Sequence, residues 1–240
     1  MKKLFHLCGC LGVLSLCLGD LDAQTQGPPP LPPGPLLQKM ADYSAMQITY
    51  SRPDDQAKLA ASAKAPPPAP TFFPTVPIRK LTLTRTKPIW HAVRVDIYGN
   101  SVGKWYDGAE YFYEVAGISQ PLYCDTKVDG FRSAAVPDFS RCDFPDMDWV
   151  SPQTYVGVEA MGAGKCLVFK KGDMTAWIDL ESRFPVQWKQ GVETRTFQQL
   201  APPTEPLVLP LKIAALAAAL KYDHDKWKRL EMRLKQQQGG

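Results

Sequence analysis

The chain has 240 residues, of which 45% are hydrophobic and 22% are charged, so it can bury a compact core and is not wholly disordered. Its net charge of +4 is too small for the basic surface that binds nucleic acid, and we expect no nucleic-acid partner. After the N-terminus, the sequence has no run of about 20 apolar residues, which is the length that a helix needs to cross a bilayer. The composition therefore predicts one globular domain.

The first 23 residues follow the pattern of a secretory signal peptide. Two lysines precede an apolar run from Leu4 to Leu18, and Ala23 supplies the small residue of a cleavage site. Cys17 offers a lipoprotein-type signal as an alternative, although Leu16 is bulkier than such signals prefer, and an uncleaved anchor is a third reading. We expect cleavage after Ala23 and export to the periplasm or cell envelope.

Cleavage would leave three cysteines, Cys124, Cys142 and Cys166. In an oxidising compartment, a disulfide between Cys124 and Cys142 would close a short loop and contribute roughly 3 kcal/mol. Cys166 would then stay unpaired in an apolar, strand-like run, which is typical of a core thiol; a reactive thiol beside Lys165 is the alternative. Three cysteines without paired C-x-x-C spacing predict no metal site.

Proline-rich segments divide the mature chain. Residues 24–35 predict an extended linker, with a disordered terminus as the alternative. A second proline-rich tract lies within residues 53–77 and predicts a long exposed loop inside the domain, which we expect over residues 36–200. Residues 201–240 are expected to form a proline-rich hinge and an amphipathic helix.

Within the domain, short runs alternate apolar and polar residues, as antiparallel strands do. A short helix is predicted ahead of them, over residues 36–45. The separators, such as Asp107-Gly108, favour hairpins and are too short for parallel crossovers, which excludes a Rossmann-type nucleotide-binding fold. The expected strands are 46–51, 79–86, 89–98, 102–106, 110–115, 154–159, 166–170, 174–180, 184–189 and 192–198.

The C-terminal residues 210–237 predict a long helix, because Pro210 suits a first turn and an alanine-rich run follows it. Its apolar residues form one stripe, interrupted at Asp223, with basic residues beside it. The stripe packs on the domain in one reading and meets a membrane surface or a partner protein in the other. The stripe comprises Ile213, Leu216, Leu220, Trp227, Leu230 and Leu234, and the basic residues are Lys221, Lys226, Lys228, Arg229, Arg233 and Lys235.

The polar residues of the mature chain match no catalytic motif. His91 shares its strand face with Ile89 and Val93, which is typical of a core or cavity-rim histidine and not of a general base. The aspartates between residues 138 and 148 match no calcium loop, and the prolines among them predict an irregular surface loop tied by Cys142. Without a P-loop, zinc motif or nucleophile elbow, we expect a non-enzymatic protein with no cofactor.

A sheet with few helices must cover its apolar face by another means. Curling around its own aromatic side chains would do so and leave a hollow for a ligand or a helix. We therefore expect a mainly β fold, in which a curved antiparallel sheet forms an open half-barrel followed by a long C-terminal α-helix. The expected lining of the hollow is Val93, Val95, Ile97, Val156, Val158, Ile178 and Val186, with His91 at its rim.

The hairpins over residues 154–198 resemble the C-terminal half of LolA-like periplasmic lipoprotein carriers and outer-membrane lipoprotein-sorting proteins. Those proteins carry a W-I-D-x-E-T-G-L-P hairpin, and this chain has WIDLESRFP over residues 177–185. Arg183 stands where the family usually has glycine. The resemblance implies an open antiparallel half-barrel capped by helices, in which the best-known members carry acyl chains.

These observations predict an exported, non-enzymatic envelope protein that binds a lipid, a lipoprotein acyl chain or another amphiphile in its concave face. Apolar burial at roughly 25 cal/mol per Å² would supply the affinity. The alternative is an interaction or structural module, whose barrel is filled by its own side chains and whose basic C-terminal helix meets an envelope protein or a membrane surface. A third reading is an extracytoplasmic hydrolase with a dispersed site.

Overall fold

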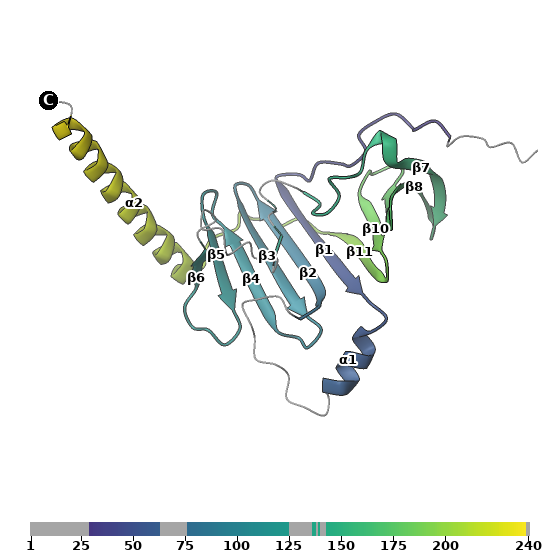
Figure 1. Cartoon of the computed structure of the whole chain (residues 1–240), viewed down its shortest axis with the longest axis horizontal. Helices are drawn as coiled ribbons and strands as arrows, with labels where there is room; N and C mark the ends of the chain where they lie inside the picture. The colour runs from purple at the N-terminus through teal and green to yellow at the C-terminus, as the bar shows by residue number, and fades with distance from the viewer. Residues whose placement is uncertain (1–28, 63–75, 125–135, 138, 140–142, 239–240) are drawn as a thin grey trace, which may run out of the picture.

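The computed structural model shows a mainly β protein with one open, curved antiparallel sheet and a long C-terminal helix (Figure 1), which confirms the expected fold class. The structure describes residues 29–62, 76–124, 136–137, 139 and 143–238. In chain order, the elements are β1 (Tyr43–Ser51), α1 (Asp55–Ser62), β2 (Ile78–Thr86), β3 (Ile89–Asp96), β4 (Ser101–Tyr106), β5 (Tyr111–Val115), β6 (Leu122–Cys124), η1 (Pro152–Thr154), β7 (Tyr155–Met161), β8 (Gly164–Lys171), β9 (Met174–Asp179), β10 (Pro185–Gln190), β11 (Glu193–Leu200) and α2 (Leu211–Gln238).

Strand β1 lies at the centre of the sheet and joins two meanders. The strand order is β6-β5-β4-β3-β2-β1-β11-β10-β9-β8-β7, so β1–β11 is the one pairing between described strands that are not consecutive in the chain. This pairing places Ile48 opposite Phe197, and β2 places Leu81 on the other side of Ile48. Directly opposed residues of antiparallel strands share a face, so such rows define the two faces of the sheet.

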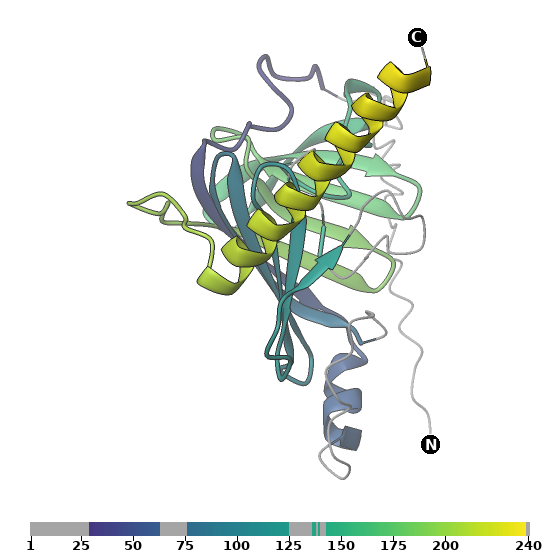
Figure 2. The same ribbon diagram turned by 90° about the vertical axis from the view of Figure 1, so that its left-hand side faces the viewer.

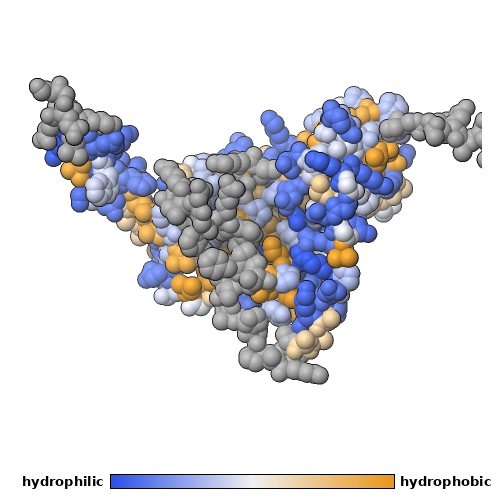
Figure 3. Space-filling view, viewed as in Figure 1, coloured by the Kyte–Doolittle hydropathy of each residue, from blue (hydrophilic) through white to orange (hydrophobic). Residues whose placement is uncertain are grey.

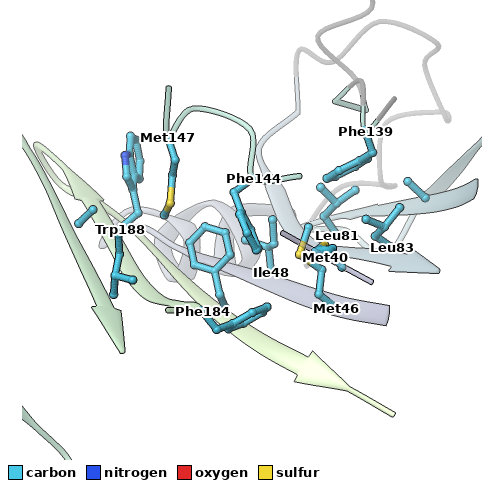
Figure 4. Close-up of a cluster of buried hydrophobic side chains, with 14 of the residues drawn as sticks. Met40, Met46, Ile48, Leu81, Leu83, Phe139, Phe144, Met147, Phe184 and Trp188 are labelled. Carbon is cyan, nitrogen blue, oxygen red and sulfur yellow. The ribbon is translucent and has the colours of Figure 1, made fainter. Parts of the chain in front are cut away.

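Both faces of the sheet bury apolar side chains. One face, here called the core face, carries a large cluster that draws on both meanders and includes Met46, Leu83 and Trp188 (Figure 4). The opposite, outer face carries a smaller cluster around Trp105 and Phe112. Strands that are buried on both faces lose the clean alternation that would identify their inner side from the sequence.

The hollow of the curved sheet is filled by the chain itself. Residues 136–137, 139 and 143–150, here called the inner segment, lie against the core face. Phe139, Phe144 and Met147 of this segment are each only 2% exposed and belong to the main cluster (Figure 4). The surface loop predicted between residues 138 and 148 is therefore wrong for the inner segment, because the apolar residues between its aspartates are buried.

The helix predicted over residues 36–45 is also wrong. Strand β1 begins at Tyr43, and the residues before it run over the main cluster without forming a helix, with Met40 buried. Burial against the sheet outweighs the local preference for a helix here. Helix α1, conversely, lies inside residues 53–77, whose proline content predicts a loop.

Helix α2 begins on the outer face and then leaves the sheet (Figure 1, Figure 2). Ile213 is fully buried in the cluster around Trp105, and Leu216 and Leu220 pack at the edge of that cluster. From residue 221 to residue 233, every residue of α2 is exposed. Within the part of the chain that the structure describes, no helix has both the length and the apolar character to span a membrane.

Candidate functional site

The structure separates the residues that were expected to line one hollow. On β3, Trp90 and Ala92 belong to the main cluster of the core face. Because neighbouring residues of a strand point to opposite faces, His91, Val93 and Val95 lie on the outer face, and each of them is only partly buried. The sequence pattern of β3 shows the alternation but does not show which of its two faces is covered.

The remaining predicted lining residues lie in different surroundings. Ile178 is fully buried in the main cluster. Val158 shares its face, since both lie opposite Leu167, but it lies at the edge of the sheet and is exposed. Val156 is exposed as well, whereas Val186 is partly buried and Ile97 is buried outside the main cluster. The eight predicted residues therefore do not line a single cavity.

His91 belongs to a packed aromatic pair on the outer face. Its ring stacks on Trp105 with ring centroids 3.9 Å apart, and the Trp105 indole donates a hydrogen bond of 2.8 Å to Glu114. Burial lowers the pKa of His91, while the charge of Glu114 raises it to a smaller extent. Gly103 leaves room for the ring, because a Cβ atom there would lie 3.0 Å from His91 Nε2. These contacts describe a structural histidine beside the base of α2.

A buried arginine on β2 anchors the inner segment. Arg85 Nη1 donates to Asp143 Oδ1 at 2.5 Å, and Arg85 Nη2 donates to the main-chain oxygen of Met40 at 2.9 Å. The second carboxylate oxygen of Asp143 accepts the backbone N–H of Met40 at 2.9 Å. A charged group buried in this way is stable only when its partners are present. The pair therefore joins β2, the inner segment and the chain before β1.

A second cation of the core face contacts the inner segment three residues farther along. Arg195 lies over the ring of Trp188 at 4.0 Å from its centroid and donates to Asp146 at 2.5 Å. Burial, the largest effect, raises the pKa of neighbouring Tyr50 to about 12.

A pocket of about 360 Å³ opens beside the pair of Arg195 and Asp146. It is lined by Asp146, Asp148, Trp149, Lys171, Met174, Trp188, Gln190 and Arg195.

A third cation of the core face is enclosed by aromatic rings. Lys104 Nζ lies 4.6 Å from the ring centroid of Tyr111 and 5.7 Å from that of Trp90, and it donates to the main-chain oxygen of Val136 at 3.3 Å. Cation–π contacts of this kind compensate part of the cost of burying an ammonium group. Sequence reasoning missed these cations, because charged residues within alternating strands are typical of the solvent side.

Arg183 fixes the proline-rich linker to the β9–β10 turn. Its φ of 60° is left-handed, a conformation that glycine adopts without strain. LolA-like proteins usually have glycine at the corresponding position of the hairpin. The Arg183 guanidinium donates to the main-chain oxygen of Pro33 at 2.8 Å, and its own main-chain oxygen accepts the N–H of Gln38 at 3.0 Å. The last residues of the predicted linker are therefore docked on the domain.

We expect Arg183→Ala to destabilise the protein by about 1–2 kcal/mol, because it removes the hydrogen bond to Pro33 and keeps the left-handed strain. Arg183→Gly removes the same hydrogen bond but relieves the strain, so it should be more stable than Arg183→Ala by about 1 kcal/mol. Urea unfolding followed by tryptophan fluorescence measures both variants. An alanine variant as stable as the glycine variant would contradict the role of backbone strain.

From residue 221 to residue 233, α2 is exposed and lies off the sheet. Its base is held by two hydrogen bonds, from the Leu207 N–H to Thr86 Oγ1 at 2.8 Å and from Lys212 Nζ to the main-chain oxygen of Ser119 at 2.7 Å. Farther along, Trp227 is 70% exposed. In Figure 3, α2 carries hydrophobic side chains among hydrophilic ones. We call residues 221–233 the distal half of α2 and take it as the candidate interaction surface.

The cysteines and acidic residues of the described ranges include one free thiol and form no metal-binding cluster. No group of three or more His, Cys, Asp or Glu side chains there is placed to hold a metal ion. Cys166 is free and buried, and burial raises the pKa of its thiol, with the charges of Asp179 and Glu159 adding to this effect. The predicted disulfide between Cys124 and Cys142 is not tested, because Cys142 lies outside the described residues.

Comparison with known proteins adds no family to this description. Neither a family model nor a curated protein matches the chain. The likeness to LolA-like carriers, which depends on the hairpin over residues 177–185, stays a prediction.

Proposed function

We propose that this protein is an exported, non-enzymatic interaction module of the cell envelope, in which a self-filled curved sheet holds the distal half of α2 out toward a partner. The observation that supports this proposal is that α2 has two parts. Its first turns pack on the outer face, and its remaining turns lie off the sheet with Trp227 exposed. The N-terminal pattern of the sequence supports export, and no cofactor is required.

The physical argument concerns the cost of an isolated helix. A helix of this length without tertiary contacts is marginal in water, because most helix stability in proteins comes from a packed apolar face. The distal half of α2 has apolar side chains on its surface but no element of the described chain to cover them. Exposed apolar surface of this kind marks a site of association.

A second proposal retains binding of an apolar or amphiphilic ligand, such as a lipid or lipoprotein acyl chain, in the concave face. The observation that favours it is the combination of apolar residues and cations on the core face, where Arg85 and Arg195 now pair with aspartates of the inner segment. An anionic amphiphile carries the same two kinds of group as that segment. This function requires the inner segment to leave the sheet.

A photo-crosslinking amino acid at position 227 tests the first proposal. We expect it to form protein adducts in intact cells, because Trp227 lies on the proposed surface. The same amino acid at position 192 is the control, since Val192 is equally exposed, at 69%, but lies in the turn between β10 and β11. Absence of adducts at position 227, or the same adducts at both positions, would contradict the proposed function.

A further inference from the structure

We infer that the distal half of α2 binds an acidic amphipathic helix of a partner protein, an inference that rests on the proposed interaction function and specifies the partner's chemistry. The observation behind it is that a ridge of basic residues borders an apolar stripe that continues off the sheet.

The apolar stripe of α2 does not end where the sheet ends. Ile213 and Leu220 lie seven residues apart and pack on the outer face; Trp227 follows after another seven residues, and Leu230 three residues later. Residues at this spacing lie on the same side of a helix. Trp227 is 70% exposed and Leu230 39% exposed, so the side of α2 that binds the sheet continues beyond it uncovered. A second helix along this stripe would lie beside the edge of the sheet.

The charges next to the stripe select the partner. Lys226, Arg229 and Arg233 follow one another at intervals of three and four residues, so they form a ridge along one side of the stripe. Lys221 and Lys228, seven residues apart, flank its other side. A partner with acidic residues on both sides of its own apolar stripe would face these cations. Exposed ion pairs are each worth less than about 1 kcal/mol, so the stripe supplies affinity and the charges supply selectivity.

A membrane surface fits these observations less well than a helix does. The stripe is on the same side of α2 as the sheet, so a flat bilayer that approaches the stripe meets the domain. Asp223 interrupts the stripe and Glu231 borders it, and an anionic lipid surface would repel both. Tyr222 and Met232 are also exposed, but by helical spacing they lie on other sides of α2. The apolar residues thus do not form one membrane-facing surface.

A second copy of α2 is a poor partner as well. In an antiparallel pair along the stripe, Lys226 of one copy would face Arg233 of the other, and like charges at this position oppose association. In a parallel pair, both sheets would have to occupy the space between the two helices, because each sheet packs on the stripe side of its own helix. An acidic helix from another protein avoids both conflicts.

Two synthetic amphipathic peptides of about 20 residues test the inference. Both carry leucine at the two core positions of each heptad, and they differ in carrying either glutamate or lysine at the flanking positions. Fluorescence anisotropy with the purified full chain should show that the glutamate peptide binds at least about tenfold more tightly than the lysine peptide, with added salt reducing the difference. Equal binding of the two peptides would overturn the inference.

Variants then locate the site. The double change Lys226→Glu and Arg233→Glu should weaken binding of the glutamate peptide about tenfold, and so should Trp227→Ala. The matched control, Lys170→Glu with Lys189→Glu, alters two exposed lysines on β8 and β10 and should change binding less than about twofold. Circular dichroism confirms that each variant is folded. A control variant that weakens binding as much as the ridge variant would overturn the inference.

The other possible partners give different results. Sedimentation into a dimer that Trp227→Ala abolishes would identify a second copy, and flotation with phosphatidylglycerol vesicles that Trp227→Ala abolishes would identify a membrane. Either result, without binding of the glutamate peptide, overturns the inference. Protein adducts from position 227 with no peptide binding would leave the proposed function standing and reject the acidic helix alone.

Discussion

Replacing Asp143 with alanine is expected to lower the free energy of unfolding by about 3 kcal/mol. The reason is that Arg85, with only 4% of its side chain exposed, would lose the carboxylate that compensates its charge, and Met40 would lose the acceptor of its backbone N–H. A buried charge without its partner carries the full cost of its desolvation. Urea unfolding at neutral pH, followed by tryptophan fluorescence, measures the change.

The control is Asp146→Asn, because asparagine tolerates the left-handed φ of 64° at this position, whereas alanine would add backbone strain. Asp146 also pairs with an arginine of the core face, but 59% of its side chain is exposed, so water can replace the lost contact. We expect this variant to cost less than about 1 kcal/mol. If Asp143→Ala and Asp146→Asn lost the same stability, the inner segment would not be anchored through Arg85.

Phe144→Ala is expected to lower the free energy of unfolding by about 3–5 kcal/mol. Phe144 is 2% exposed and meets Phe184 edge to face, with ring centroids 5.5 Å apart, so its removal leaves a cavity between the inner segment and the turn after β9. The loss should appear as a lower midpoint of one cooperative thermal transition. Tyr222→Ala, which removes an exposed ring from α2, should leave this midpoint unchanged within about 1 °C.

This variant also separates the two proposed functions. If the inner segment is part of the core, Phe144→Ala lowers the midpoint and binds no more hydrophobic dye at low temperature than the unmodified protein does. If the segment is a separable cover of a ligand site, the variant keeps its thermal midpoint and binds more dye. The second result would favour an amphiphile-binding function.

Much of the fold could be predicted, because short turns between strands and the alternation of apolar and polar residues along a strand are local properties of the sequence. The strands from β2 to β5 and from β7 to β11 begin and end within a few residues of their predicted bounds, and α2 runs from Leu211 to Gln238 where a helix over 210–237 is predicted. Strand β6 has only three residues, which is too short for a periodic signal. Helix α1 is hidden by the prolines that follow it.

The faces of the strands could not be predicted, because the buried residues do not keep to one side. On β8, four consecutive residues from Cys166 to Phe169 are buried, so alternation does not distinguish the core face. On β3, Arg94 and Asp96 are buried on the core face, whereas Val93 is only partly buried on the outer one. The inner segment was missed for a related reason, since aspartates and prolines are typical of surface loops.

The candidate surface on α2 was visible in the sequence as a stripe with basic residues beside it. The sequence left open whether the stripe packs on the domain or meets a partner. The structure shows that the first turns of α2 pack on the domain and that residues 221–233 lie off the sheet (Figure 1), whereas contact with a partner stays a proposal. That division depends on tertiary structure and has no local signal.

Because β1 lies at the centre of the sheet, one strand pairing, between β1 and β11, accounts for most of the loop-closure entropy that is lost on folding. Among the described strands, nine of the ten pairings join neighbours in the chain, whereas β1 and β11 come together across about 150 intervening residues. Strands that are neighbours in the chain pair quickly. Strands that are distant in the chain pair slowly, because the entropy of closing the long loop between them is lost before the first stabilising contact forms. We therefore expect pairing of β1 with β11, which places Ile48 opposite Phe197, to be the slow step in the folding of this sheet.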